Sequence, residues 1–279
     1  MTEFWAKSVG PRGIAPLFSV ITVVLNAREQ IEETILSVVG QSFRDFEYIV
    51  VDGGSSDGTL DIIRKHGDGV DRWVTEPDSG IYDAFNKGIS LARGAYVGLL
   101  NAGDRFVPGA LQAVASVYAC GGAKGTVVCG GLQIVEPLDG TVRTVIRDRT
   151  ILGSRFRFMF LNHPSTFVPR TVYERVGLYD STYRISGDFE FAHRLLRHGI
   201  EVTFIPEVIT VMRAGGVSSR LSFVVLREFF RVVCKYGGVL RAVLESARAF
   251  PIIVARGVER AVRAEVRKYS DIGDEARSL

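Results

Sequence analysis

Polar side chains that could bind a ligand follow three apolar stretches in the first half of this chain. The stretches and their polar ends are Phe18–Leu25 with Asn26, Tyr48–Val51 with Asp52, and Ala95–Leu100 with Asn101-Ala-Gly-Asp104. Continuous runs of Val and Ile are typical of buried parallel strands. Open α/β sheets bind their ligands at the carboxyl ends of such strands. The sequence therefore predicts a binding edge where these polar groups lie.

Asp52 opens an acidic, glycine-rich turn that continues to Thr59 and leads into a helical pattern. A carboxylate at the rim of a sheet can accept hydrogen bonds from a ribose or a base. The same segment is also compatible with an ordinary strand-to-helix turn, in which Ser55 or Asp57 caps the following helix. The residues alone leave both interpretations open for Asp52.

These polar ends must be positioned by alternating strands and helices, and the alternation from Phe18 onward indicates βαβ units with a mainly parallel sheet. The predicted helices are Glu29–Val39, Gly58–His66, Gly80–Ala92 and Pro108–Tyr118, and the predicted strands are Phe18–Leu25, Phe46–Val51, Trp73–Thr75, Ala95–Leu100 and Thr126–Val135. After Val135 we expect short strands at Thr141–Ile146 and Ser165–Val168, a helix at Asp188–Arg197, and a strand pair, Glu201–Ile205 and Val208–Met212, around Pro206. From Arg220 the pattern is helical.

The composition fits a packed α/β core, because 47% of the 279 residues are hydrophobic and 30 are glycines. We predict a flexible leader over residues 1–16, one domain over 17–219 and a helical region over 220–279. The three cysteines, Cys120, Cys129 and Cys234, lack the CxxC or CxxH spacing of a zinc site. An odd and scattered set predicts reduced thiols, no structural zinc and a cytosolic compartment.

The constellation of strand ends resembles the inverting family 2 glycosyltransferases of the GT-A fold, which pass a sugar from a nucleotide carrier to an acceptor hydroxyl. The resemblance extends roughly from Phe18 to Arg213. It implies a Rossmann-like, mostly parallel sheet with helices on both faces, followed here by C-terminal amphipathic helices. It also implies a nucleotide-sugar half over 17–135 and an acceptor half over 136–219.

The resemblance assigns donor recognition to the ends of the first strands and to the helix near Gly80. The implied nucleotide-sugar-binding residues are Thr22, Val24, Asn26, Asp52, Asn86, Asn101 and Gly103. Two places that often carry Tyr and a second acid in the family hold Leu25 and Gly53 here. A UDP-linked donor is the preferred expectation over a guanosine one. Lys87 could meet the diphosphate as a point charge, or it could be a solvated surface lysine.

Asp104 is the candidate ligand of a divalent cation, Mn²⁺ or Mg²⁺, that neutralises the departing diphosphate. It resembles the last acid of the family's Asp-x-Asp motif, whereas Asn101 and Gly103 occupy places that often carry acids. With a single protein carboxylate, occupancy of the site would depend on the bound nucleotide. The alternative is that Asp104 is a turn residue ahead of the helix that begins near Pro108.

Asp188 is the candidate general base, since Arg184-Ile-Ser-Gly-Asp-Phe-Glu-Phe-Ala-His-Arg194 resembles the segment that carries the family's catalytic base. In direct displacement it would accept the acceptor's proton and thereby contribute ~10²–10⁴ in rate. Glu190 is the second candidate. Both acids are also placed as expected for an ordinary helix start. His163 precedes a predicted strand of the acceptor half. It is either a neighbour of the acceptor or the metal, or a histidine packed within the protein.

The C-terminal region carries most of the positive charge. Between Arg220 and Lys268 there are eleven Lys and Arg residues against four Glu, an excess of seven in a chain whose net charge is +3. Arg227, Arg231 and Lys235 recur every four residues, as Arg256, Arg260, Arg263 and Arg267 nearly do. Such helices suit an anionic membrane surface, or they pack on the domain with a solvated basic face. No aromatic-interleaved basic motif points to nucleic acid.

These features predict a single-transfer glycosyltransferase of cell-surface polysaccharide or glycolipid biosynthesis, located in the cytoplasm at the inner face of the membrane. The acceptor would be a glycan or lipid-linked molecule, and residues 220–268 would make the membrane contact. A sugar nucleotidyltransferase is one alternative, although Asn26-Ala-Arg-Glu29 is no glycine-rich phosphate loop. The other is a catalytically silent membrane scaffold that keeps the fold.

Overall fold

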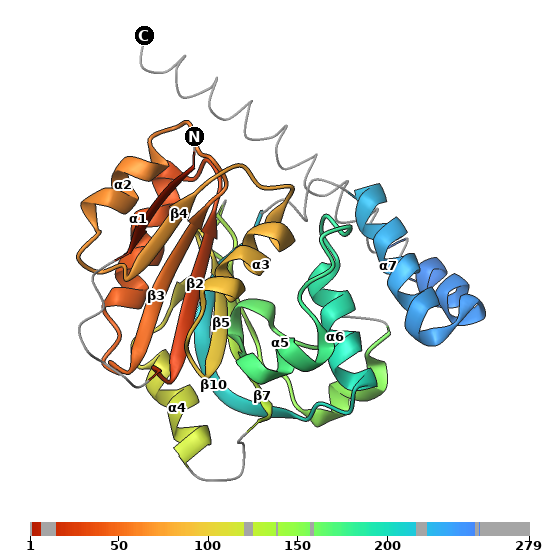
Figure 1. The fold of residues 1–279 in the computed structure, drawn as a ribbon. Helices are drawn as coiled ribbons and strands as arrows, with labels where there is room; N and C mark the ends of the chain where they lie inside the picture. The colour runs from red at the N-terminus through yellow and green to blue at the C-terminus, as the bar shows by residue number, and fades with distance from the viewer. Residues whose placement is uncertain are drawn as a thin grey trace, which may run out of the picture. The chain divides into compact units, whose positions relative to one another are not determined.

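A ten-stranded sheet forms the centre of the main unit, Met1–Ala214, in this computed structural model (Figure 1). The structure describes residues 2–6, 15–119, 125–137, 139–156, 159–215, 222–248 and 251. The strand order is β1-β4-β3-β2-β5-β9-β7-β10-β6, and β8 pairs with β7. The predicted α/β class with a mostly parallel first half is confirmed.

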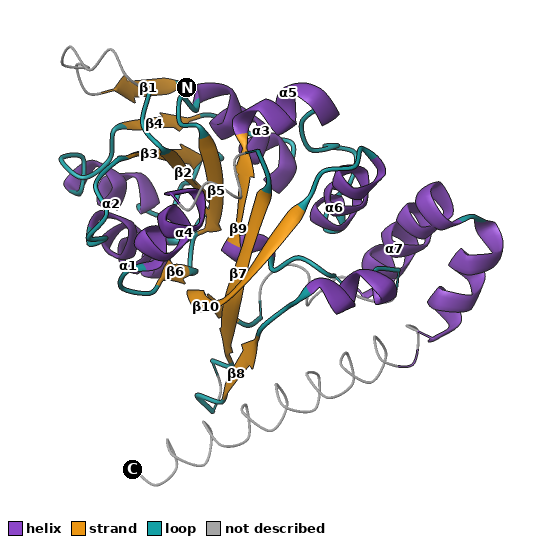
Figure 2. Cartoon of the chain, turned by 90° about the horizontal axis from the view of Figure 1, so that it is seen from below, coloured by secondary structure: helices purple, strands orange, loops and turns teal. Residues whose placement is uncertain are grey.

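Four strands pair in parallel in the first half of the unit. They are β2 (Phe18–Val24), β3 (Phe46–Asp52), β4 (Arg72–Thr75) and β5 (Tyr96–Asn101). Helices α1 (Arg28–Val39), α2 (Thr59–Lys65) and α4 (Ala110–Ala119) lie on one face, and α3 (Ile81–Leu91), α5 (Arg170–Val176) and α6 (Gly187–Arg197) lie on the other (Figure 2). Because both faces are covered, β2 is buried along its whole length.

The second half of the unit adds antiparallel pairing. Strand β9 (Thr166–Pro169) runs antiparallel to both β5 and β7 (Val127–Val135), and β8 (Val142–Val145) is antiparallel to β7. The two-residue strand β6 (Arg105–Phe106) pairs with β10. Two 3₁₀ helices, η1 (Arg149–Ser154) and η2 (His163–Ser165), lie between β8 and β9 in the sequence.

The strand pair predicted around Pro206 is wrong. Residues Val202–Arg213 form one strand, β10, which runs parallel to β7 with register shifts between Phe204 and Val208 and between Val208 and Thr210. Proline cannot donate a ladder hydrogen bond, but a β-bulge tolerates it. The proline therefore marks an irregular step within one strand instead of a reversal between two.

Four residues of the predicted flexible leader form a strand. Glu3–Ala6 make β1, which pairs antiparallel with β4 at the edge of the sheet. Trp5 packs against the core, and Glu3 forms an ion pair with Arg64. An exposed edge strand offers unpaired backbone groups to any chain that can reach it, so this pairing follows from the position of β4 more than from the leader's own pattern.

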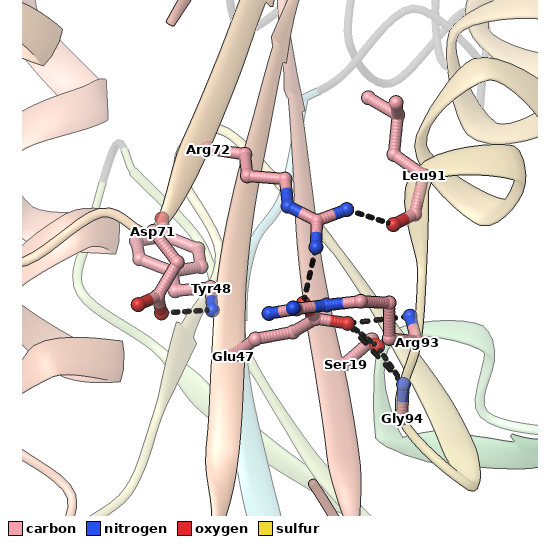
Figure 3. Close-up of polar contacts among 8 residues, drawn as sticks. All are labelled: Ser19, Glu47, Tyr48, Asp71, Arg72, Leu91, Arg93 and Gly94. Carbon is pink, nitrogen blue, oxygen red and sulfur yellow. Dashed lines mark hydrogen bonds and ion pairs between the residues drawn. The ribbon is translucent and has the colours of Figure 1, made fainter. Parts of the chain in front are cut away.

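A buried ionic network ties together the amino ends of the parallel strands (Figure 3). The carboxylate of Glu47, a residue 2% exposed, lies 3.0 Å from the Arg93 Nε and 3.5 Å from the Arg72 Nη2. Ser19 donates a hydrogen bond of 2.6 Å to the same carboxylate, and the Gly94 amide donates another. Each oxygen is thus satisfied, as a buried charge requires. The network lies opposite the carboxyl ends that carry the candidate site.

The second unit, Gly215–Leu279, contains α7 (Ser222–Gly237) and a further helical stretch at 239–248. The side chains of Arg227, Arg231 and Lys235 are exposed on α7, as their spacing predicts. The second basic series, Arg256 to Arg267, lies outside the described residues, as does Cys120. Cys129 and Cys234 are free thiols. Within the described residues, no helix combines the length and apolar character needed to cross a membrane.

Candidate active site

The carboxyl ends of β2, β3, β4 and β5 meet at one edge of the sheet. In the strand register Val24 lies opposite Asp52, Val23 opposite Asn101, and Asp52 opposite Thr75. The polar groups that follow these strands therefore lie at one level, as parallel pairing requires. This edge is the candidate donor site.

Asp52 is held by its own turn. The residue is 1% exposed, and its carboxylate accepts hydrogen bonds from the Ser55 amide, the Ser55 hydroxyl and the Thr75 hydroxyl. These bonds occupy both oxygens. Asp52 thus has the strand-end position that the sequence predicts, but its side chain shapes the loop beneath the site.

The turn between β2 and α1 is anchored by the loop between β3 and α2. The amide of Asn26 donates to the Ser55 hydroxyl at 2.7 Å, that of Ala27 to the Thr59 hydroxyl at 3.0 Å, and that of Arg28 to the Asp57 carboxylate at 3.0 Å. Asn26, at a φ of 49°, accepts from the Ser56 amide in return. Asp57 also accepts from the Thr59 amide at the start of α2 at 3.0 Å, so this loop holds the starts of both helices, where amides otherwise lack partners.

Two residues predicted to bind the donor point into the core. Thr22 is fully buried and receives a hydrogen bond of 3.0 Å from the Tyr48 hydroxyl. Val24 is 5% exposed and belongs to the apolar cluster that packs beneath α1. Alternate residues of a strand face opposite sides of a sheet, and these two share the side covered by α1.

The turn Asn101–Asp104 is fixed by helix α1. The Thr34 hydroxyl donates to the Asp104 carbonyl at 2.8 Å and accepts from the Gly103 amide at 2.9 Å. Gly103 has a φ of +95°, a conformation that favours glycine, and a Cβ there would approach the Gln30 side chain within 2.9 Å. An acid at position 103 would therefore strain this turn.

Asp104 is a buried carboxylate with little compensation. It is 5% exposed, and burial raises its pKa to about 7, against the effect of hydrogen bonds from Arg213 and Asn101. The Asn101 Nδ2 lies 3.4 Å from the Asp104 Oδ2, and the buried Asn101 Oδ1 has no hydrogen-bond partner. Two oxygen ligands with an unmet demand for positive charge fit a hard divalent cation. The described residues contain no cluster of three or more His, Cys, Asp and Glu side chains suited to a metal ion.

Asp188 lies in the first turn of α6, where the helix dipole favours a negative charge. Its Oδ1 is 3.2 Å from the Tyr82 hydroxyl, which also donates to the Ile185 carbonyl. The Tyr82 ring comes so close to Gly187 that a Cβ there would lie 2.7 Å from it. Tyr82 thus fixes the start of α6 and orients Asp188. Tyr82 is not among the site residues predicted from the sequence, although it directly precedes Asp83 on α3.

Glu190 differs from Asp188 in its surroundings. It is fully buried and pairs with Arg194 at 2.8 Å, and the Arg194 guanidinium also donates to the Val176 and Leu178 carbonyls. An acid held in this way supports the packing of α6. Of the two predicted bases, Asp188 has the accessible position.

His163 and Asp188 line a common narrow cavity of about 10 Å³, room for about one water molecule. The His163 ring packs 5.1 Å from the Phe85 ring, and its buried Nε2 has no hydrogen-bond partner. Burial lowers the pKa of His163, while the charge of Asp188 raises it. His163 thus packs against α3 beside the same small cavity as Asp188, as the packed-histidine alternative describes.

Asn86 and Lys87 on α3 are both engaged within the protein. Asn86 donates to the Tyr179 carbonyl and accepts from the Tyr179 amide, each at 2.9 Å. It therefore clamps the segment that leads into α6. Lys87 pairs with Glu76 at 3.0 Å and with Asp83 at 3.5 Å. Burial lowers the pKa of Lys87, but the hydrogen bond and charges of these acids raise it on balance.

Known proteins resemble this chain in sequence and in fold. Residues 19–171 match the family model described as "Glycosyl transferase family 2", which is more than half of the 279 residues. A PGL/p-HBAD biosynthesis glycosyltransferase of Mycobacterium tuberculosis (strain ATCC 25177 / H37Ra) is 29% identical over 260 residues, covering 88% of this chain and 94% of that relative.

Solved structures share the fold at low identity. S. aureus TarS has a TM-score of 0.61 and 16% identity, with 80% of this chain but only 41% of the TarS chain covered. TarS 1–349 in complex with UDP-GlcNAc has a TM-score of 0.60, with 16% identity and coverages of 80% and 69%. The mannosyltransferase PcManGT from Pyrobaculum calidifontis, in complex with GDP-Man and Mn²⁺, has a TM-score of 0.59 and 17% identity, with coverages of 91% and 81%.

Proposed function

Since this chain belongs to glycosyltransferase family 2, we propose that it moves a single sugar from a nucleotide-sugar donor to a hydroxyl of a glycan or lipid-linked acceptor, with inversion at the anomeric carbon. The enzyme is a glycosyltransferase of this family. The donor edge of the sheet and the Asp188 cavity supply the two parts that such a transfer needs. The observation that carries the proposal is the buried carboxylate of Asp104 beside the buried, unpartnered Oδ1 of Asn101 at the end of β5.

Asn101 and Asp104 would hold a divalent cation. When bound, Mn²⁺ or Mg²⁺ supplies positive charge to the departing diphosphate. The two side chains contribute oxygen ligands, and Thr34 keeps their turn in place through the Gly103 amide and the Asp104 carbonyl. The pKa of Asp104 near 7 supports this role, because an ionised carboxylate in this position gains from a nearby cation.

Asp188 would act as the general base. As the acceptor oxygen bonds to the anomeric carbon, the bond from that carbon to the diphosphate oxygen breaks and the acceptor proton passes to the Asp188 carboxylate. The Tyr82 hydroxyl orients this carboxylate. Its single proton can bond to ionised Asp188, or it can turn to the Ile185 carbonyl once Asp188 carries the transferred proton. Tyr82 is therefore a positioning residue for both protonation states.

We propose a UDP-sugar as the donor. Two of the TarS structures that share the fold are complexes, one with UDP and one with UDP-GlcNAc. PcManGT, with a similar TM-score, binds GDP-Man, so the fold alone accommodates either nucleotide. Direct comparison of UDP and GDP binding decides between them.

We also propose that the protein works at the cytoplasmic face of a membrane on a lipid-linked acceptor. Support comes from the second unit, where the basic face of α7 is exposed and Phe223 has an exposed fraction of 84%. On the stretch 239–248, Leu240 is 76% exposed and Val239 is 66% exposed. Exposed apolar side chains beside basic ones suit an interfacial helix. Co-sedimentation with vesicles that contain anionic lipid, compared with neutral vesicles, measures this contact.

The test of function is turnover of a panel of UDP- and GDP-sugars with Mn²⁺ and with EDTA. Slow release of UDP or GDP to water is a readout that needs no acceptor. We expect metal-dependent release by the wild type and a loss of about 10²–10⁴ in the Asp188→Asn variant. Equal rates in both proteins would remove Asp188 from the mechanism. No turnover and no nucleotide binding with any donor would favour the silent scaffold.

A further inference from the structure

Asp78 lies on the turn that follows β4, beside the loop that follows β3. A Cβ built on Gly53 would lie 2.2 Å from the Asp78 Oδ2, so the Asp78 carboxylate occupies the space of a side chain at position 53. Gly53 directly follows Asp52 in the sequence. Two neighbouring strands therefore bring Asp78 to the donor edge, at a place that sequence spacing does not reveal.

Asp78 has a free acceptor where Asp52 has none. Both Asp52 oxygens are occupied by Ser55 and Thr75, and the residue is 1% exposed. In Asp78 the Oδ1 accepts from the Gly80 amide at 3.0 Å. Within the described part of the chain, its Oδ2 over Gly53 receives no hydrogen bond, and the residue is partly accessible. The Oδ2 of Asp78, called its outer oxygen below, is thus the carboxylate acceptor available to a ligand at the ends of β3 and β4.

The charges around Asp78 indicate a need for hydrogen-bond donors. Burial raises the pKa of Asp78, and the nearby charges of Asp83 and Asp52 act in the same direction against the Gly80 amide and Lys87. Lys87 itself is occupied by Glu76 and Asp83. A neutral N–H or O–H donor from a ligand would stabilise the outer oxygen without disturbing these pairs.

We propose that Asp78, in place of Asp52, is the acid that recognises the nucleoside of the donor. Its Oδ2 accepts a hydrogen bond from an N–H or O–H group of that nucleoside, either a ribose hydroxyl or the imide N–H of the base. This inference rests on the proposed donor site and adds a specificity-determining residue to it. The ribose hydroxyl and the base N–H would each donate a hydrogen bond to the same oxygen, and nucleotide analogues that lack one of these donors distinguish them.

The first experiment is calorimetric titration of UDP and GDP, with Mn²⁺, into the wild type and the Asp78→Asn variant. Asparagine keeps an oxygen for the Gly80 amide and replaces the outer acceptor with an NH₂ donor. We expect affinity for the preferred nucleotide to fall about 10- to 100-fold, the effect of one hydrogen bond to a charged group. Asp61→Asn is the matched control, because it removes the same charge from a side chain that is 82% exposed and should bind as the wild type does.

The analogue arms identify the contacted group. If Asp78 binds the ribose, the 2′-deoxynucleotide loses affinity in the wild type but not in Asp78→Asn. If Asp78 binds the base, the N3-methyluracil or N1-methylguanine nucleotide loses affinity in the wild type but not in Asp78→Asn. Should every analogue lose the same factor in both proteins, Asp78 contacts neither group and the inference is wrong.

A transplanted acid provides a rescue. Asp78→Ala removes the atoms that crowd Gly53, whose φ lies outside the left-handed region, so Gly53→Asp can be added in that background. We expect the double variant to regain part of the affinity that Asp78→Ala loses, at an unchanged melting temperature. Unchanged affinity in Asp78→Asn with a wild type that binds would overturn this inference alone. A wild type that binds neither nucleotide would overturn the proposed donor site as well.

Discussion

Replacing Asp104 with asparagine should stabilise the metal-free protein at alkaline pH. Burial raises the pKa of Asp104 from an ordinary 3.8 to about 7. The folded protein therefore binds this proton more tightly than the unfolded chain does. The stability contributed by the protonated side chain is complete below pH ~3.8 and is lost as the pH rises through about 7.

The size of the effect follows from the gap between the two pKa values. The gap is about 3 pH units, and each unit corresponds to about 1.4 kcal/mol. Ionised Asp104 thus costs the metal-free fold at most roughly 4 kcal/mol at pH 9. For a chain of this size each kcal/mol shifts the melting temperature by about 2–4 °C, so the variant should melt up to roughly 8–16 °C higher there.

The assay is thermal unfolding of the wild type and Asp104→Asn in EDTA at pH 5, 7 and 9. The difference between the two melting temperatures should be less than half of its full size at pH 5, grow up to pH 7 and level off between pH 7 and pH 9. Mn²⁺ at pH 9 should raise the melting temperature of the wild type by mass action, with a smaller effect on the variant. Asp61→Asn serves as the control for a lost surface charge. Parallel melting curves across the pH range would refute the idea of a desolvated carboxylate, and an equal response to Mn²⁺ would remove Asp104 from the cation site.

Three further changes test the supporting structure. Glu190→Gln breaks a fully buried ion pair and should lower the free energy of unfolding by about 3–5 kcal/mol in a denaturant titration; a variant as stable as the wild type would show that the pair is not needed for packing. Tyr82→Phe removes the hydroxyl that lies 3.2 Å from the Asp188 Oδ1, so kcat should fall about 10-fold, the worth of one hydrogen bond, at an unchanged melting temperature; a lower melting temperature with unchanged kcat would indicate a purely structural role. Glu47→Gln removes the buried charge that pairs with the Arg72 guanidinium, so the free energy of unfolding should fall by about 3–5 kcal/mol in the same titration. Nucleotide affinity of the folded protein should not change. A fall in affinity would mean that this network affects the carboxyl ends of the strands.

The sequence is sufficient for the parts of the fold that depend on local pattern. Runs such as Phe18–Val24 are long, apolar and followed by polar turns, and the strands lie where these runs occur. Pattern fails where tertiary pairing decides the outcome. Pro206 resembles a turn in sequence but lies in a bulge of β10, since β7 provides a partner along its length. Glu3–Ala6 form a strand because the edge of β4 is there to pair with.

For the site, residue type and spacing predict location better than they predict contacts. Asp52 lies at the end of β3 as expected, but its carboxylate is held by Ser55 and Thr75. Asn86 lies on α3, where it clamps Tyr179. Asp78 could not be found in this way, because its proximity to Gly53 arises only when β3 and β4 pair. Those contacts depend on side-chain packing between loops that are distant in sequence.

The anchoring of the β2–α1 turn has a consequence for how the enzyme meets its substrate's charge. In many α/β nucleotide-binding proteins the start of the first helix holds phosphate through its unpaired amides. Here Ser55, Thr59 and Asp57 already occupy three consecutive amides, and the Asp57 carboxylate balances the helix dipole. If the proposed donor site is correct, these three amides are not available to the diphosphate, and its charge would fall to the cation proposed at Asn101 and Asp104. The rate of transfer should therefore follow the free Mn²⁺ or Mg²⁺ concentration around the protein, which would make local ion supply a control on its output.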